Sequence, residues 1–352
     1  MKSNFLRIIL LASILIVSII LVFRFLNIEE QHLELKTQIN PDNQIPSERI
    51  WNNNQLNNIH LNTDVNDSLL NAMLIKQFND TLYIVDYADM KIKRFTKDGD
   101  YLDKFGENIG RGPNDFTQII DISFANENLY AVDAQTQLIK VFDISSKKSS
   151  EVIKANQLTI RVLAFHDMKV TLSLSQDLFR TFDQTNNLQH SYGELADKQF
   201  ANIMSFGGSL LPSENENEFI YVPTYASYLL FYTTDGKYVK SIQTIDKLPF
   251  PKSEITGTGV RAPKPDLITQ SATYNNKYLL IQYSRRPIED HSNKKFRIHH
   301  SFIDIYSRDG ERYLKSILLP QRSAGVNVLG DTLYTINFEN RKIEAFFLPE
   351  IE

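Results

Sequence analysis

The feature that most limits what this chain can fold into is a repeated order of short apolar segments and tight turns. In the first copy, residues 82–86 (LYIVD) and 91–95 (KIKRF) precede Asp98-Gly99 and then residues 101–105 (YLDKF). Runs of β-branched and aromatic residues that alternate with polar ones favour strands. An Asp-Gly pair between two such runs predicts a hairpin, and we expect a type I′ turn with positive φ angles. We therefore interpret this copy as three antiparallel strands.

The same order recurs until there are six copies, and each copy is preceded by one further apolar segment. An aromatic residue ends the middle strand of every copy: Phe95, Phe142, Phe182, Tyr232, Tyr306 and Phe346. These residues are roughly 40 to 50 positions apart, with one longer interval, and four-stranded units of that length are typical of propeller blades. The sequence therefore predicts an all-β, six-bladed β-propeller with four-stranded antiparallel blades. The irregular spacing disfavours the alternatives, a β-solenoid or a pair of sandwiches.

The sixth copy ends at residue 348 without room for an outermost strand. Residues 57–62 (NNIHLN) lie just before the first copy and are able to supply it. We expect them to pair with residues 341–347, which would tie the two ends of the ring together and cover an exposed strand edge.

The N-terminus is predicted to target the chain to a membrane and to anchor it there. Residues 8–23 are an uninterrupted apolar run, preceded by Lys2 and Arg7 and followed by Glu29 and Glu30. The exit from this run has no small residues where a signal peptidase would cut, so a retained helix is favoured over a cleaved signal peptide, which stays the alternative. The charge order places the rest of the chain outside the membrane. We assign residues 1–27 to the signal anchor, 28–56 to a linker and 57–352 to an extracytoplasmic propeller, periplasmic if the source is Gram-negative.

Composition excludes several classes of function. The chain has no cysteine, which removes disulfides, thiolate nucleophiles and Cys-bound zinc. Its net charge is −4 and it has no basic tail, so we expect no nucleic-acid partner. No cofactor motif is present, and we expect a monomer without a cofactor. Whether a metal lies on the propeller axis is left open.

Residues 104–116 (KFGENIGRGPNDF) follow the first predicted blade. Together with the LYIVD segment and the Asp-Gly hairpins, they resemble the NHL-like and TolB-like six-bladed propellers, many of which are membrane-anchored proteins or lipoproteins. The resemblance covers roughly residues 57–348, although the full motif occurs only at 110–116. It implies a scaffold that binds a ligand or a partner, or occasionally a lyase or lactonase.

The loops that join the second and third strands of each blade should share one face with the loops between blades. We call this the loop face. Its candidate ligand-binding residues are Tyr87, Arg111, Tyr225, Arg261, Arg285 and Arg286. The arginines could converge into an anion-binding mouth, and the alternative is that they are scattered, solvated charges.

Asp86, Asp133 and Asn337 occupy equivalent positions in three copies. Such a set could ring a metal, but we favour the interpretation that each side chain caps nearby backbone N–H groups. The sequence thus favours a non-catalytic propeller that binds a partner protein, peptide or glycan at the loop face. The alternative is a lyase or hydrolase with an axial divalent metal.

Overall fold

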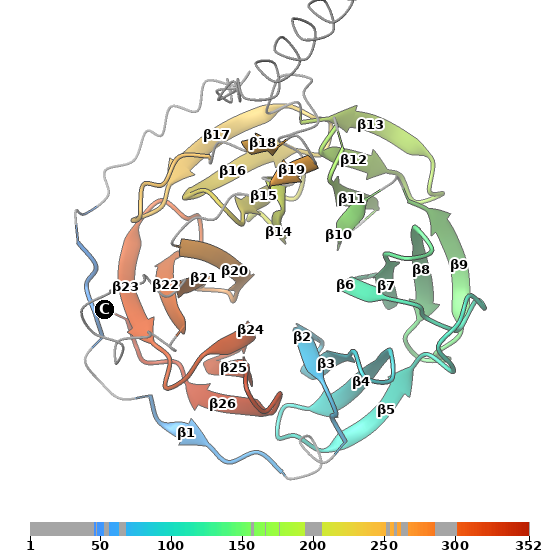
Figure 1. The fold of residues 1–352 in the computed structure, drawn as a ribbon, viewed down its shortest axis with the longest axis horizontal. Helices are drawn as coiled ribbons and strands as arrows, with labels where there is room; N and C mark the ends of the chain where they lie inside the picture. Colours follow the sequence, from blue (N-terminus) through green and yellow to red (C-terminus); the bar gives the residue numbers. More distant parts are fainter. Residues whose placement is uncertain are drawn as a thin grey trace, which may run out of the picture.

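In the computed structural model, the described residues are 46, 48–52, 56–62, 68–155, 158–165, 167–175, 177–193, 206–250, 254–256, 259–261, 267–285 and 301–351. They form six four-stranded sheets arranged as a ring, together with one two-stranded sheet (Figure 1). Every four-stranded sheet is antiparallel, with its strands ordered from the axis to the rim. The predicted six-bladed propeller is confirmed.

Blades one to three follow the chain without interruption. Blade one contains β2 (Ala72–Phe78), β3 (Thr81–Asp86), β4 (Lys91–Thr96) and β5 (Tyr101–Phe105). Blade two contains β6 (Ile119–Ala125), β7 (Asn128–Asp133), β8 (Leu138–Asp143) and β9 (Ser149–Lys154). Blade three contains β10 (Thr159–Phe165), β11 (Met168–Ser173), β12 (Phe179–Phe182) and β13 (Leu188–Tyr192).

Blades four to six contain the long connections and the closure of the ring. Blade four contains β14 (Gly208–Pro212), β15 (Glu218–Pro223), β16 (Tyr228–Thr233) and β17 (Tyr238–Gln243), and is followed by a hairpin of β18 (Glu254–Thr256) and β19 (Gly259–Arg261). Blade five contains β20 (Leu267–Tyr274), β21 (Tyr278–Arg285), β22 (Ser301–Ser307) and β23 (Tyr313–Leu318). Blade six contains β24 (Ser323–Leu329), β25 (Thr332–Asn337), β26 (Ile343–Phe347) and β1 (Asn58–Ile59).

The ring closes as the sequence predicts. Strand β1 comes from before the first blade and becomes the outermost strand of the sixth, pairing Asn58 with Phe346 and Ile59 with Ala345. In Figure 1 this blue strand lies outside the red strand β26. The two ends of the described chain therefore meet in one sheet, which covers the edge of β26.

The hairpin turns differ from the expected type I′. Gly99, Gly236 and Gly310 have φ angles of +96°, +96° and +77°, but the aspartates before them are not among the residues with positive φ. Each glycine N–H bonds to the carbonyl three residues earlier, and the register shifts nearby. These features indicate a type I turn followed by a glycine bulge. Asp-Gly still predicts the hairpin, because the glycine supplies the one left-handed position.

The core is divided among the junctions between blades. Six clusters of buried apolar side chains occur in the described chain, and each joins two adjacent blades. The junction of blades one and two contains Tyr83, Phe105, Phe116 and Phe142. Because every blade is buried on both faces, its second strand is mostly apolar rather than alternating.

The described residues 48–52, before β1, also contact the ring. The backbone of Ile50 and Asn52 bonds to Ser316 of β23 at 2.8 Å in each case, and the ring of Trp51 packs edge-on against Phe302. Residues 48–52, which the sequence assigns to the linker, are thus packed against blade five. No described residue belongs to a helix long and apolar enough to cross a membrane, and the apolar run 8–23 lies outside the described residues.

Candidate ligand-binding site in the central channel

Two cavities follow one another along the propeller axis. The first, which we call the mouth cavity, has a volume of about 400 Å³ and is lined near the beginnings of the six inner strands, at the loop face. The second, the rear chamber, has about 720 Å³ and is lined by the ends of those strands and the turns after them. Lys76, Leu210, Ala272 and Asn327 line both cavities. The two spaces therefore adjoin at a waist formed by these residues.

Bulges in the inner strands shape the mouth cavity. A register shift occurs at the same height in five of the six inner strands: 72/74 in β2, 119/121 in β6, 159/161 in β10, 269/271 in β20 and 323/325 in β24. Bulges redirect side chains and are frequent next to binding sites. Asp121 and Arg161 come directly after two of these shifts, so their side chains stand at the same height on neighbouring blades.

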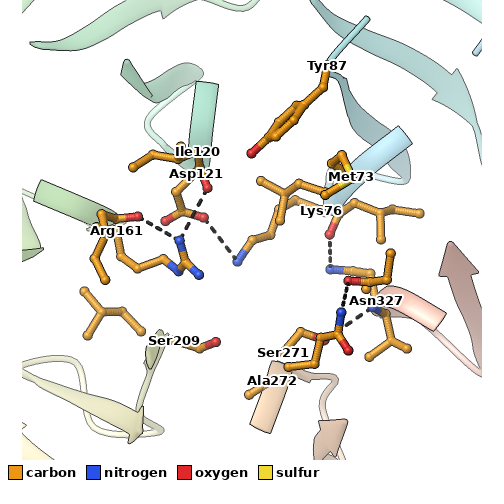
Figure 2. Close-up of a pocket in the computed structure, with 18 residues that line it drawn as sticks. Met73, Lys76, Tyr87, Ile120, Asp121, Arg161, Ser209, Ser271, Ala272 and Asn327 are labelled. Atoms are coloured by element: carbon orange, nitrogen blue, oxygen red, sulfur yellow. Dashed lines mark hydrogen bonds and ion pairs between the residues drawn. The ribbon is translucent and has the colours of Figure 1, made fainter. Parts of the chain in front are cut away.

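Three charged side chains from three blades meet in the mouth cavity (Figure 2). Lys76 Nζ of blade one lies 4.0 Å from Asp121 Oδ1 of blade two. The other carboxylate oxygen of Asp121 accepts a hydrogen bond of 3.0 Å from the backbone N–H of Val162. Arg161 of blade three donates from NH1 to the carbonyl of Ile160 at 2.8 Å and to that of Ile120 at 3.4 Å. Figure 2 shows the ends of Lys76 and Arg161 both below the carboxylate of Asp121, inside the cavity.

The rest of the wall, on the side of blades four to six, combines polar and apolar residues. Gln270 donates to the carbonyl of Ala324 at 3.1 Å and accepts from Ser284, and Ser271 donates to Gln282 at 2.7 Å, so both side chains are bonded within the protein. Asn327, at the waist, has an exposed fraction of 5% and donates to the carbonyl of Ile75 at 3.5 Å. Its Oδ1 has no hydrogen-bond partner within the described part of the chain. Because this oxygen is buried, a molecule in the cavity does not reach it.

Tyr87 covers the loop-face side of the mouth cavity. It belongs to the turn between β3 and β4, and its N–H bonds to the carbonyl of Asn71 at 3.0 Å. Burial raises the pKa of its hydroxyl above the ordinary value, with nearby Arg161 acting in the opposite direction. The phenol thus remains protonated at neutral pH and is able to donate a hydrogen bond.

Comparisons with known proteins agree with this architecture. The family DUF5128, described as a 6-bladed beta-propeller, matches residues 53–246, more than half of the chain. The chain belongs to this family. No curated protein matches it. The finer resemblance to NHL-like and TolB-like propellers stays a prediction.

Solved structures share the fold at low sequence identity. One, titled "Putative exported protein", from Bacteroides fragilis NCTC 9343, is 13% identical, with a TM-score of 0.57 over 85% of this chain and 95% of that one. A member of the duf4221 family from Bacteroides vulgatus ATCC 8482 is 9% identical, with a TM-score of 0.53 over 91% and 98%. The Cps50 (Swd1) β-propeller domain of Myceliophthora thermophila is 10% identical, with a TM-score of 0.51 over 79% and 96%. Such likeness shows the fold alone.

Of the three predicted ligand-binding residues whose side chains the structure describes, Tyr87 lines the mouth cavity. Arg111 is exposed in the loop 106–118 and Tyr225 is half-buried, and neither is among the described residues that line that cavity. Arg261 belongs to β19, and Arg285 ends β21 opposite Leu267, but their side chains lie outside what the structure describes. Arg286 lies wholly outside the described residues. A basic mouth formed by these arginines stays a prediction.

The motif around Arg111 has a structural role in this blade. A Cβ on Gly112 would stand 2.5 Å from Asp115 Oδ2, and Asp115 Oδ1 accepts from the N–H of Asn108 at 2.9 Å. Lys140 of β8, only 1% exposed, donates to the carbonyls of Gly112 and Asp115, and Phe116 is fully buried. The glycine and aspartate therefore fold the loop onto blade two, while Arg111 points to solvent.

The equivalent residues Asp86, Asp133 and Asn337 cap backbone N–H groups, as favoured from the sequence. Asp86 accepts from Leu70, Asn71 and Ala88, Asp133 from Thr117 and Gln118, and Asn337 from Glu339 and Asn340. Asp86 also lies 2.8 Å from Lys93 Nζ, and Asp133 lies 3.7 Å from Lys140 Nζ. The described residues contain no group of three or more His, Asp or Glu side chains that could hold a metal ion.

The sequence reasoning missed Lys76, Asp121 and Arg161 as site residues. Each lies in an inner strand, where a charged residue ordinarily indicates a solvent-facing position. The available signal was their place in the repeat, since all three precede the buried second strand of consecutive blades.

Proposed function

We propose that this chain is an extracytoplasmic propeller, held at a membrane by its N-terminal apolar segment, that binds a partner protein, peptide or glycan through the mouth cavity without catalysing a reaction. The observation that carries the proposal is the mouth cavity itself. Its wall combines two cations, one carboxylate and several amide and hydroxyl groups contributed by different blades. A concave site with a few converging polar groups is the usual form of a ligand site in a protein of this kind.

The mouth cavity offers charge and hydrogen bonds rather than an obvious set of reacting groups. Its one carboxylate in the described wall, Asp121, is 3% exposed and already accepts from Val162. Binding is therefore the activity that its geometry supports best. The extracytoplasmic location is supported by the charge order around residues 8–23 and by the description of one structural neighbour as exported.

A variant that fills the mouth cavity tests the binding proposal. Ser209 lines the mouth cavity, and Figure 2 shows its hydroxyl directed into the space. Ser209→Trp should fill the cavity, whereas Val239→Trp places the same ring on the exposed outer strand of the same blade. The full-length protein in detergent is applied to glycan and peptide arrays. Ligands should be retained by wild type and Val239→Trp and lost by Ser209→Trp, and equal binding by all three proteins would contradict the proposal.

Topology is tested separately. Protease added to spheroplasts should remove an epitope tag from the C-terminus, while a fragment containing residues 1–26 stays with the membrane fraction. A mature soluble form that begins near Asn27 would contradict the anchor, and a tag protected until the membrane is lysed would contradict the extracytoplasmic location.

A further inference from the structure

We infer that the mouth cavity binds a sugar acid, with the ligand's carboxylate between Arg161 and Lys76 and one of its hydroxyls bonded to Ser209. This inference rests on the proposed function, because it names the ligand class of the same site. Each of its parts follows from a separate group in the wall.

The net charge of the wall favours a ligand with a single negative charge. Lys76 and Arg161 contribute two positive charges and Asp121 one negative charge, so the described wall of the mouth cavity carries an excess of one cation. Asp121 lies 4.0 Å from Lys76 Nζ, which is longer than a hydrogen bond, so the ammonium group keeps donors for a second anion. A ligand with one carboxylate would balance this excess.

Arg161 is held in an orientation that suits a carboxylate. Its NH1 is bonded to the carbonyls of Ile160 and Ile120, which fixes the plane of the guanidinium. Figure 2 shows that this plane lies inside the cavity beside Asp121. A guanidinium has five N–H donors in a rigid fork and matches a carboxylate through two parallel hydrogen bonds. Because the backbone already orders the side chain, ligand binding would cost little additional rotamer entropy.

Ser209 and Tyr87 supply hydroxyl groups near that charge. Both residues line the mouth cavity, and Figure 2 shows their hydroxyls directed into it. A hydroxyl both donates and accepts hydrogen bonds. A ligand that has hydroxyls next to its carboxylate bonds to the two cations and to these groups together, and sugar acids have that arrangement.

Size and lining favour a sugar over an acidic side chain. The mouth cavity of about 400 Å³ falls in the range of small-molecule sites. Gln270 and Ser271 are already bonded within the wall, whereas Ser209 adds a hydroxyl to it, and Tyr87 adds one aromatic face and a donor. A ring with several hydroxyls uses these groups, whereas the carboxylate of an acidic peptide would leave them unused.

Calorimetry on the full-length protein in detergent tests this inference with three probes. D-glucuronate has the carboxylate and the hydroxyls, D-glucose has the hydroxyls alone, and glutarate has carboxylates without hydroxyls. We expect glucuronate to bind at least about tenfold more tightly than either of the others. Equal affinity for glucose would overturn the role of charge, and tighter binding of glutarate or of an acidic dipeptide would overturn the sugar.

Single substitutions test the role of each wall residue in glucuronate binding. Arg161→Gln should weaken glucuronate binding at least about tenfold, whereas Arg312→Gln, at an exposed arginine of the blade-five hairpin, should have no effect. Asp121→Asn removes the competing charge and should tighten binding. Ser209→Ala should weaken glucuronate but not glutarate. Unchanged glucuronate affinity in Arg161→Gln, or weaker affinity in Asp121→Asn, would overturn the inference. If the sugar-acid tests fail but the array ligands bind wild type and not Ser209→Trp, the proposed function stands and the sugar-acid assignment alone is overturned.

Discussion

The guanidinium of Arg49 lies 2.9 Å from the carboxylate of Asp304, in the middle strand of blade five. It also pairs with Asp246, which follows blade four, and stacks 4.6 Å from the ring centroid of Phe302. Burial opposes the charge of Arg49, but its hydrogen bonds to the two carboxylates outweigh that effect and raise its pKa. The segment before the ring thus connects blades four and five.

Replacing Arg49 should destabilise the propeller strongly. Asp304 is fully buried, and Arg49→Ala would leave its charge without a cation. Breaking a buried pair in this way costs about 3–5 kcal/mol. Urea unfolding should show this loss for Arg49→Ala and a smaller one for the double variant with Asp304→Asn. If the single and double variants unfold alike, the ion pair is not what holds the segment.

Ring closure predicts an ordered series of truncations. A chain that begins at residue 46 should melt like the full chain, one that begins at 56 should lose the Arg49 contacts, and one that begins at 63 should also lose β1 and expose β26. An open strand edge promotes association between chains. Thermal melting and light scattering should therefore show the lowest midpoint and the most aggregation for the shortest chain. Equal behaviour of the chains from 56 and 63 would mean that β1 does not close the ring.

The buried Asp86–Lys93 pair predicts acid sensitivity. Burial alone would raise the pKa of Asp86, but bonds from Lys93 and from two backbone N–H groups outweigh it and hold the pKa below the ordinary 3.8. A carboxyl whose pKa is lower in the folded than in the unfolded protein stabilises the folded state at pH values above its unfolded pKa. This contribution is lost as the pH falls through the folded-state pKa. Asp86→Asn should therefore be less stable than wild type at pH 7, by about 1–3 kcal/mol, with the difference shrinking below pH 3.8.

Urea midpoints across pH measure this effect. Asp80→Asn is the control, since Asp80 is an exposed turn residue, and it should follow wild type throughout. A constant gap between Asp86→Asn and wild type from pH 7 to pH 2 would show that the ionised carboxyl is not the source of the stability.

The loop at 106–118 should depend on its glycine and not on its arginine. Gly112→Ala would place a Cβ 2.5 Å from Asp115 Oδ2 and displace that carboxylate from the N–H of Asn108, with a loss of about 1–3 kcal/mol. Arg111→Ala should leave unfolding within about 0.5 kcal/mol of wild type. Gly207→Ala is the matched glycine control, because its nearest neighbour is 3.7 Å away. A Gly112→Ala protein as stable as the Gly207→Ala protein would contradict the packing described for the loop.

Most of the architecture was predictable from the sequence because it is local and repeated. Asp-Gly at 98–99, 235–236 and 309–310 marks the hairpins, and the buried second strands of the blades are mostly apolar. The closure by residues 57–62 followed from counting strands, since the sixth blade lacked one. The packing of Arg49 was not predictable, because its partners Asp246 and Asp304 are about 200 and 255 positions away.

The site was harder to predict than the fold for a physical reason. Lys76, Asp121 and Arg161 meet only because the ring brings equivalent strands of three blades to one axis. Bulges then direct Asp121 and Arg161 into the mouth cavity, and no short motif marks a bulge. Arg111, in a Gly-Arg-Gly-Pro loop, was the stronger local signal, yet the glycines around it serve packing against Asp115.

A crystal structure of the protein soaked with D-glucuronate would show whether the mouth cavity is the ligand site. We predict the sugar in the mouth cavity, with its carboxylate within hydrogen-bonding distance of Arg161 and a hydroxyl bonded to Ser209 Oγ. Glucuronate bound on the rim or in the rear chamber, or a mouth cavity left empty at concentrations where calorimetry shows saturation, would contradict this prediction.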